Sequence, residues 1–245
     1  MQPITKIFKK RLKSTNLYAS GLLVKNRPTD PFWIRADDQF GGKGQGDHTW
    51  ASEPGKNLTG TLVIFPERLN ASEQFILSMT FALAVNDFLG LFTGEIMIKW
   101  PNDLYAGEKK IGGILIETAV MGPWIDHAIL GVGINVNQVD FPADVPNPVS
   151  LTRLTGVKHD LVELENLLLA SFRNWYRMIE SGNLIGVQEE YLKRLYRFGK
   201  LADYQTNNKI FKARITGVTP FGHLILEDER GLKRSFAFQE VQYLI

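Results

Sequence analysis

A glycine-rich stretch that contains one lysine, residues 39–50 (QFGGKGQGDHTW), is the first segment of this chain whose residue types suggest chemistry. Glycine has no side chain, so backbone amides in such a stretch can approach a ligand closely, and Lys43 adds a positive charge beside them. A P-loop requires Gly-Lys-Ser/Thr and a dinucleotide site requires Gly-x-Gly-x-x-Gly, and neither spacing is present. Taken alone, the stretch is better explained as a flexible surface turn.

Three further polar segments fall at predicted strand ends or turns, where ligand sites are usually built. They are residues 14–16 (STN), 99–110 (KWPNDLYAGEKK) and 131–135 (GVGIN). Strand glycines either mark the close approach of a ligand or relieve crowding between strands. For the pair Gly112 and Gly113, and for Gly131 and Gly133, crowding is the better explanation when each pair is considered alone.

The side chains in these segments are mainly lysines, amides and hydroxyls, which suit the binding and neutralisation of an anion. Asp103 and Glu117 are available, but no two carboxylates recur as a general acid and base pair. The 4 histidines are far apart, no Gly-x-Ser-x-Gly elbow is present, and with no cysteine a thiolate metal site is excluded. The sequence therefore predicts chemistry by positioning and electrostatics rather than by a hydrolytic nucleophile.

Composition limits the class of protein that can carry this site. With 245 residues, 44% of them hydrophobic and 22% charged, the chain is typical of one large globular domain or a domain with a small appendage. The formal net charge of +2 predicts no nucleic-acid partner and no membrane surface. Residues 4–11 lack the apolar core of a signal peptide, and no apolar run reaches the roughly 18 residues that span a bilayer, so a cytoplasmic protein is expected.

Hydrophobic spacing predicts the elements that position these segments in the first half of the chain. A strand is expected over 4–11, a helix after the capping residues 14–16, and strands over 32–36 and 61–65. Asn70 and Glu73 form a capping box for a core helix that runs to Leu89, with Gly90 just beyond its end.

Strands over 96–100, 110–117 and 128–136, joined by short connections with a turn at 102–108, predict an antiparallel meander. Residues 141–148 are expected to form a loop, and helices are expected over 160–179 and 184–195. Beyond Arg197, short strands over 209–219, 223–228 and 232–238 predict a small all-β module. The expected organisation is an α+β domain over 1–197 followed by a β domain over 198–245.

Taken jointly, the motifs resemble those of biotin protein ligases in order and spacing. The string Lys-Trp-Pro-Asn-Asp at 99–103, followed by Lys-Ile-Gly-Gly-Ile-Leu-Ile-Glu at 110–117, is highly specific for that family. The resemblance extends from about Lys6 to the C-terminus. It implies a mixed, largely antiparallel sheet with flanking helices, similar to class II aminoacyl-tRNA synthetases, and a C-terminal SH3-like β-barrel.

The resemblance also implies an activity. Such ligases join biotin to ATP with Mg²⁺, release pyrophosphate, and pass the biotinyl group from biotinyl-5′-adenylate to a specific lysine of a biotin carboxyl carrier protein or domain. Some relatives carry an N-terminal DNA-binding domain, and none is expected here, so the chain is interpreted as a ligase only, working as a monomer or weak homodimer.

The family's functional residues correspond to definite positions of this chain. Lys110 and Lys43 are implied as the catalytic cations. The residues implied for biotin are Ser14, Thr15, Asn16, Gln39, Gly42, Lys43, Gly44, Gln45, Lys110, Gly113, Leu115 and Gly131. Those implied for the nucleotide are Lys43, Gln45, Trp50, Asn102, Lys110 and Asn135. Asp103 is implied as a Mg²⁺ or ribose contact, or else as a cap of the turn after Pro101.

The glycine-rich stretch departs from the family pattern, which often reads Gly-Arg-Gly-Arg-x-Gly. Lys43 and Gln45 replace the arginines, and Asp47 stands where glycine is usual. Lysine lacks the bidentate fork of arginine and Gln45 has no charge, so a weaker hold on the adenylate is expected. Two alternatives stay open: a lipoate ligase or octanoyl transferase, and a non-catalytic adenylate- or carrier-binding module.

Overall fold

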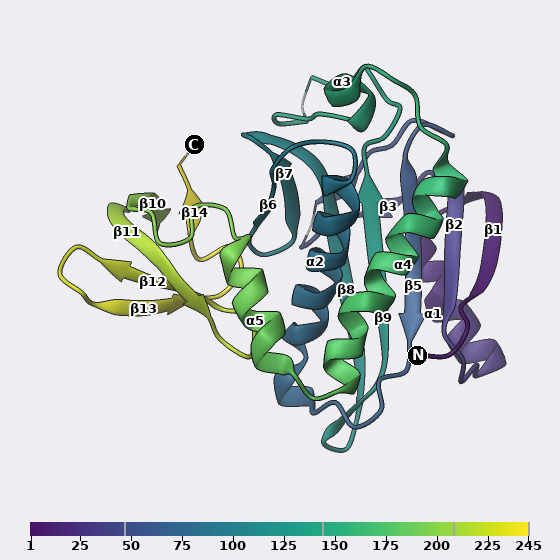
Figure 1. Ribbon diagram of the computed structural model, residues 1–245, viewed down its shortest axis with the longest axis horizontal. Coiled ribbons are helices and arrows are strands. Elements are labelled where there is room, and N and C mark those ends of the chain that lie inside the picture. Colours follow the sequence, from purple (N-terminus) through teal and green to yellow (C-terminus); the bar gives the residue numbers. More distant parts are fainter. Residues whose placement is uncertain (47, 144, 208, 245) are drawn as a thin grey trace.

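The computed structural model describes residues 1–46, 48–143, 145–207 and 209–244. These residues form two large sheets and one two-stranded ribbon, with helices packed mainly on the largest sheet (Figure 1). In the described residues the larger sheet has seven strands in the order β1-β2-β5-β9-β8-β7-β6. β1 and β2 pair in parallel and the remaining neighbours are antiparallel. The strands are β1 (Thr5–Leu12), β2 (Phe32–Gln39), β5 (Leu58–Ile64), β6 (Ile96–Lys99), β7 (Asp103–Ala106), β8 (Lys109–Met121) and β9 (Trp124–Ile134).

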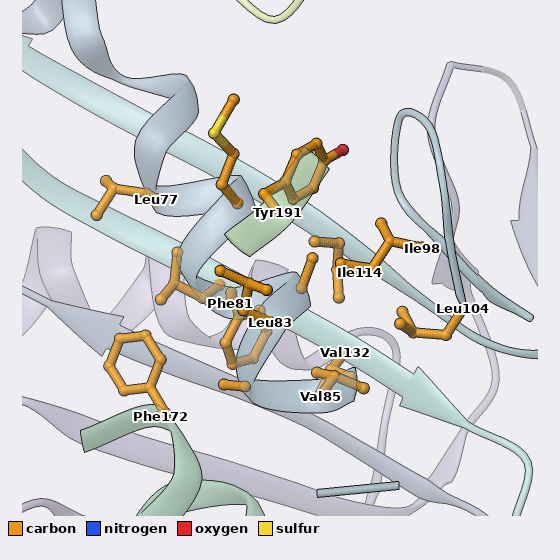
Figure 2. Packing of buried hydrophobic residues seen from close by; sticks show 14 of the residues in the cluster. Leu77, Phe81, Leu83, Val85, Ile98, Leu104, Ile114, Val132, Phe172 and Tyr191 are labelled. Atoms are coloured by element: carbon orange, nitrogen blue, oxygen red, sulfur yellow. The ribbon is translucent and has the colours of Figure 1, made fainter. Parts of the chain in front are cut away.

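Helices cover both faces of this sheet, because its central strands are apolar on both sides. On β5, Leu62 belongs to the large core beneath α2 (Phe75–Gly90) and α4 (Leu161–Glu180), whereas Val63 packs towards α1 (Thr15–Asn26). Figure 2 shows the larger core, where Phe81 of α2 lies beside Phe172 of α4. Their rings meet edge to face at a centroid distance of 5.6 Å. The sheet is thereby held rigidly from both sides.

The start and end of α2 differ from the capping prediction. Asn70 accepts a hydrogen bond from the Ser72 amide and so caps a short 3-10 turn, η1 (Ala71–Glu73), while α2 begins at Phe75 without a side-chain cap. Gly90 is the last residue of α2 instead of the residue beyond it. The predicted capping box for α2 was therefore wrong, because burial of nearly the whole helix replaces local signals at its ends.

The predicted meander is confirmed, with one more strand than expected. The segment predicted as a turn contains β7, which pairs with β6 from Ile96↔Ala106 to Lys99↔Asp103 and also with β8. Asn, Asp and Gly are depleted in strands, so local propensity concealed β7. Pairing on both sides overrides that propensity.

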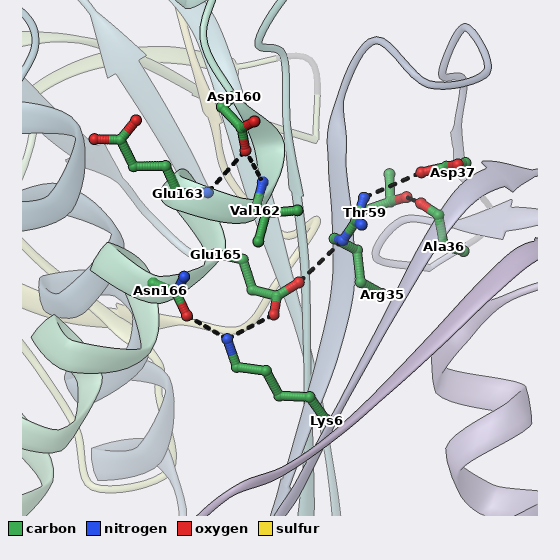
Figure 3. Close-up of polar contacts among 10 residues, drawn as sticks. All are labelled: Lys6, Arg35, Ala36, Asp37, Thr59, Asp160, Val162, Glu163, Glu165 and Asn166. Atoms are coloured by element: carbon green, nitrogen blue, oxygen red, sulfur yellow. Dashed lines mark hydrogen bonds and ion pairs between the residues drawn. The ribbon is translucent and has the colours of Figure 1, made fainter.

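Two basic residues of β1 and β2 hold α4 against the sheet through a single carboxylate (Figure 3). Glu165 is only 5% exposed, and its oxygens lie 2.8 Å from Lys6 Nζ and 3.0 Å from Arg35 Nε. Asp160 caps α4 by accepting from the amides of Val162 and Glu163, as predicted. An isolated buried carboxylate is costly, so the two cations offset the cost of burying Glu165.

The second sheet follows α5 (Leu184–Lys193) and, within the described residues, has five antiparallel strands in the order β13-β12-β11-β10-β14. Its strands are β10 (Ala202–Thr206), β11 (Lys209–Val218), β12 (Leu224–Asp228), β13 (Lys233–Phe236) and β14 (Gln242–Tyr243). β10 and β14 were not predicted. The sheet is consistent with the SH3-like module that was expected, and the α+β fold class is confirmed.

One hydrogen bond joins this second sheet to the Lys-Trp-Pro-Asn-Asp segment. The indole Nε1 of Trp100 donates to the carbonyl of Gly222 at 2.8 Å. Gly222 has a φ of +87°, and a Cβ at this position would lie 2.4 Å from the ring of Phe75 on α2. Only glycine fits both the backbone conformation and this contact, so the loop between β11 and β12 lies tightly against Trp100 and the start of α2.

Candidate functional site

A cavity of about 950 Å³ lies where the ends of several strands meet, and it collects nearly all the side chains predicted for the site. Every predicted site residue lines this cavity except Gly42. Its walls come from described residues of segments that are far apart in sequence: 14–16, 39–45, 48–51, 99–115, 131–135, 141–142, 145–148 and 238–243. A volume near the upper end of the usual range for ligand pockets has room for a nucleotide beside a second small molecule.

One end of the cavity is polar, uncharged and hydrogen-bonded to the protein itself. Ser14 caps α1 by accepting from the Leu17 amide at 3.5 Å. The amide and hydroxyl of Thr15 both donate to Oε1 of Gln39, at 2.9 and 3.1 Å. The first turn of α1 and the end of β2 are therefore held in one arrangement, with Nε2 of Gln39 left as a donor.

Asn16 completes this polar end and explains one of the strand glycines. Its side chain is 7% exposed and lies against Gly131 of β9. A Cβ on Gly131 would lie 2.4 Å from Asn16 Oδ1, closer than real Cβ contacts. Close packing therefore requires glycine at position 131, because the absence of a side chain there makes room for Asn16 in the cavity wall.

The other end of the cavity carries positive charge. Lys110 Nζ lies 2.6 Å from Asp103 Oδ1, and the two side chains are 31% and 22% exposed. Asp103 is thus an ion-pair partner at the start of β7, and the predicted cap of the turn after Pro101 is not what its carboxylate does. Each partner holds the other in place at the wall of the cavity.

Lys99 belongs to the same charged end. Its Nζ donates to the Tyr105 hydroxyl at 3.1 Å and lies 5.2 Å from the centroid of the Tyr243 ring in the second sheet. Burial lowers the pKa of Lys99 below its ordinary value of 10.5, the Asp103 carboxylate opposes this shift, and Lys110 and Arg197 add to it. Burial likewise raises the pKa of Tyr105 to about 12.

The glycine-rich stretch is more ordered than a simple turn. It forms a two-stranded ribbon, β3 (Gly42–Lys43) and β4 (Thr49–Trp50), with Gly42 opposite Trp50. Gly42 lies behind the cavity, where a Cβ would be 2.6 Å from both Gln39 Nε2 and the Trp50 carbonyl. Lys43, Gly44 and Gln45 face the cavity. The predicted departure at Asp47 lies outside the described residues.

Trp50 at the end of this ribbon covers the second strand glycine of β9. A Cβ on Gly133 would lie 2.4 Å from the Trp50 indole, so the ring rests directly on the strand backbone. The Trp50 Nε1 is buried and has no hydrogen-bond partner among the described residues. This nitrogen lies on the strand side of the ring, 2.7 Å from the Cβ position of Gly133.

Two predicted nucleotide contacts already have protein partners. The side-chain nitrogen of Asn102 donates to the Ile114 carbonyl at 2.8 Å, and that of Asn135 donates to the Val149 carbonyl at 3.1 Å. These bonds hold the edges of β8 and β9 to neighbouring loops. Each amide keeps its oxygen as an acceptor that could face a ligand.

The sequence did not reveal one wall of the cavity. Phe238, Gln239, Val241, Gln242 and Tyr243 reach it from the second sheet, and no local pattern in that sequence signals a site. Phe141, Pro142, Val145, Pro146 and Pro148, from the segment predicted as a loop, form another part. Lys99 was within a quoted motif, but its place in the lining follows only from the pairing of β6 with β7.

No cluster of three or more histidine, aspartate or glutamate side chains suited to a metal occurs in the described parts of the chain. Among the described residues that line the cavity, Asp103 is the one carboxylate. Mg²⁺ is commonly held by one or two carboxylates together with phosphate oxygens and water. Asp103 fits that mode of binding and does not fit a cage built from protein ligands alone.

Residues 8–135 match the Biotin/lipoate A/B protein ligase family. This chain belongs to that family, which confirms the resemblance seen in its motifs. A biotin–[acetyl-CoA-carboxylase] ligase of Paracoccus denitrificans is 32% identical over 90% of this chain and 93% of its own length. The bifunctional ligase/repressor BirA of Bacillus subtilis is 28% identical over 92% of this chain and 70% of its own length.

Solved structures show the same fold. Biotin protein ligase from Aquifex aeolicus, in complex with biotin and ATP, superposes with a TM-score of 0.79 at 22% identity and covers 98% of this chain and 99% of that chain. Biotin acetyl coenzyme A carboxylase synthetase from Helicobacter pylori, with bound biotinylated ATP, gives a TM-score of 0.60 at 20% identity, covering 95% of this chain and 100% of that one. Within the described residues, no helix is both long and apolar enough to cross a membrane.

Proposed function

We propose that this chain is a biotin protein ligase, which forms biotinyl-5′-adenylate from biotin and ATP and transfers the biotinyl group to a lysine of a biotin carboxyl carrier protein or domain. The observation that carries the proposal is the division of one cavity into two ends. A neutral, hydrogen-bonded end contains Ser14, Thr15, Asn16 and Gln39, and a cationic region contains Lys99 and Lys110 beside Asp103. Lys43 adds a further positive charge to the lining of the same cavity. The reaction requires both regions, because biotin has an uncharged ring to be recognised and a carboxylate that must approach the α-phosphate of ATP.

The neutral end suits the ureido ring of biotin, which has no charge and needs directional donors and acceptors. The hydroxyls of Ser14 and Thr15 and the free nitrogen of Gln39 provide them. Biotin would then lie with its carboxylate towards Lys110.

The cationic region addresses the central difficulty of the first step. A carboxylate oxygen of biotin attacks the α-phosphorus of ATP, the bond to the β-phosphate breaks, and pyrophosphate leaves with its electron pair. Two anions about 4 Å apart repel by roughly 4 kcal/mol at an effective dielectric of 20. We assign Lys110 the main catalytic role of offsetting this repulsion, with Lys43 sharing the charge.

The glycine-rich ribbon and β9 suit the nucleotide. Trp50 offers an aromatic ring, while Gln45, Asn102 and Asn135 provide polar groups in the same lining. Gly44 also lines the cavity, although its backbone amide already donates to the His48 carbonyl at 2.8 Å within the ribbon. With lysine and glutamine in place of two arginines, we expect this ribbon to hold the adenylate less tightly than the usual family sequence.

Mg²⁺ supplies charge neutralisation at the phosphates when it is bound, and Asp103 with phosphate oxygens would hold it. Asp103 also orients Lys110 through their ion pair, so its carboxylate positions the catalytic lysine as well. In the second step the carrier lysine attacks the acyl carbon of the adenylate and AMP leaves, which regenerates the starting enzyme.

We also propose that residues 1–197 form the catalytic domain and residues 198–245 the β domain, working together as a monomer or weak homodimer in the cytoplasm, where ATP is available. The wall formed by residues 238–243 supports joint action of the two parts in binding. With a formal net charge of +2, no nucleic-acid partner is proposed. Analytical ultracentrifugation at several concentrations tests the oligomeric state.

Two assays test the proposed activity. Biotin-dependent exchange of pyrophosphate into ATP reports adenylate formation, and mass spectrometry of reactions with candidate carrier domains reports transfer. We expect exchange with biotin and a carrier mass increased by one biotinyl group. Exchange with lipoate or octanoate but not biotin would reverse the choice of substrate. Absence of exchange with all three acids would support a binding module.

A further inference from the structure

The side-chain amide of Asn16 is held in one orientation by Leu115 and by two residues that were not predicted to belong to the site, Glu117 and Thr61. Its nitrogen faces Oε2 of Glu117 at 2.7 Å and the Leu115 carbonyl at 3.4 Å. Both of these partners present oxygen acceptors, so the nitrogen of the amide faces them. The oxygen of the amide then necessarily faces the other way.

That oxygen receives a hydrogen bond from Thr61. The Thr61 hydroxyl donates to Asn16 Oδ1 at 2.6 Å, and Thr61 is 0% exposed in the middle of β5. It lies on the face of the sheet that α1 covers, and it does not line the cavity. Thr61 therefore reaches the site only through Asn16.

This arrangement uses nearly all the bonding capacity of the Asn16 side chain. Both hydrogens on its nitrogen have protein acceptors, and one lone pair of its oxygen is occupied by Thr61. Gly131 on β9 closes the remaining side, because a Cβ there would lie within 3.0 Å of three atoms of the amide. Rotation of the Asn16 amide would break its bonds and meet the strand backbone.

We propose that Thr61 is a positioning residue for biotin, which acts by holding Asn16 and, with it, the first turn of α1. This inference rests on the proposed function and identifies a group behind the site that the reaction depends on. Asn16 stands beside Thr15, whose amide and hydroxyl are bonded to Gln39, so a shift of Asn16 displaces the neutral end as a whole. Glu117 supports the same amide to a smaller degree, because the Leu115 carbonyl is a second acceptor there.

The role has a kinetic consequence that a purely structural role lacks. The neutral end binds biotin equally before and during the reaction, so its disorder raises the KM for biotin and leaves kcat nearly unchanged. The KM for ATP also stays nearly unchanged, because Lys110 and Lys99 are held by Asp103 and Tyr105 and not by the Asn16 network. Loss of one buried hydrogen bond that leaves its acceptor unpaired predicts about a tenfold rise in the KM for biotin.

Three substitutions test the inference. Thr61→Val removes the hydroxyl at constant size, Thr61→Ser retains it, and Thr59→Val is the matched control. Thr59 is 1% exposed on the same face of β5, and its hydroxyl donates to the Ala36 carbonyl at 2.8 Å, away from Asn16. Biotin KM, ATP KM and kcat are measured by pyrophosphate exchange, and the melting temperature is measured without ligand.

We expect Thr61→Val to raise the biotin KM about tenfold, Thr61→Ser to stay within about twofold of wild type, and Thr59→Val to lower the melting temperature without changing the biotin KM. An unchanged biotin KM in Thr61→Val overturns the inference, as does an equal rise in Thr59→Val. If Thr61→Val does not fold, Glu117→Ala at the exposed end of the network is the deciding variant. We expect Glu117→Ala to raise the biotin KM about threefold, and an unchanged biotin KM in this variant overturns the inference.

A measurement without catalysis separates this inference from the proposed function. The side-chain NH₂ resonances of Asn16 are followed by NMR, with hydrogen exchange that we expect to be slow in wild type and Thr59→Val and at least about tenfold faster in Thr61→Val. Exchange that is equal in all three proteins overturns the positioning role. If the wild type adenylated lipoate or octanoate instead of biotin, the proposed function would fail, while the same variants would still report the KM of that acid.

Discussion

The two ends of the cavity differ in how their side chains are held. At the neutral end, Thr15 and Asn16 are fixed by hydrogen bonds to neighbouring side chains at 2.6–3.1 Å. At the charged end, Lys110 has a single ion-pair partner in Asp103, and both are partly exposed. Within the described residues, Lys43 has no ion pair at all.

This difference follows from what each end has to recognise. Hydrogen bonds to an uncharged ring weaken steeply with angle, so donors and acceptors must be held in place before the ligand arrives. Attraction between charges falls slowly with distance, so a lysine on a flexible stem remains effective while it moves. Substitutions at the neutral end should therefore change binding, and substitutions at the charged end should change the rate of reaction.

The largest effect is expected at Lys110. Lys110→Ala removes the cation assigned to the space between carboxylate and phosphate, and loss of one such preorganised group costs about 10²–10³ in rate. Pyrophosphate exchange measures it. Lys109→Ala is the control, because Lys109 is exposed next to it and does not line the cavity. Normal turnover of Lys110→Ala would refute the assignment of its role.

A smaller effect, on binding, is expected from Gly131→Ala. The new Cβ would lie 2.4 Å from Asn16 Oδ1, and relief of such overpacking costs about 1–3 kcal/mol. The biotin KM should rise about tenfold to a hundredfold with kcat less affected. Gly217→Ala in β11 is the control, because its Cβ would meet only Ile225 at 3.6 Å. A fall in kcat without a change in KM would contradict the division between the two ends.

Gln45→Arg tests whether the glycine-rich ribbon is weakened by its departure from the family pattern. A new guanidinium facing the cavity would add a charge-assisted hydrogen bond to a phosphate, which predicts about tenfold slower release of the adenylate. Stopped-flow or filter binding measures the release. The difference should shrink at high salt because exposed charges are screened. An unchanged rate of release at low salt would disprove the idea.

The smallest effect is expected from Lys99→Met and concerns stability against pH. The pKa of Lys99 is lowered in the folded protein, so between that value and 10.5 the unfolded chain binds more protons, and stability contributed by this group rises with pH. Tyr105, with a pKa raised to about 12, acts in the opposite direction above pH 10. Urea unfolding at pH 8 to 10 should therefore show a rise in wild type that is flatter in Lys99→Met. Equal slopes would argue against the buried charge of Lys99.

Much of the fold followed from local patterns. Apolar spacing and capping residues agree in several elements, which is why these were predicted. They are the strands that contain the glycine pairs, the helix after Ser14 and the helix that begins after Asp160. β7 was missed because its flanking residues favour turns, and the cap of α2 was misplaced because burial decides where that helix begins. Local propensity is a weak signal wherever pairing or packing opposes it.

The sequence by itself determined which residue types are present and in what order, which was enough to recognise the family and to assign Lys110, Gly131 and Trp50 to one site. Only the tertiary structure decided which residues stand behind that site. Thr61 holds Asn16 across β5, and Tyr243 reaches Lys99 from the second sheet. Such contacts join residues far apart in the chain, and they arise from strand register and helix packing, which no short motif records.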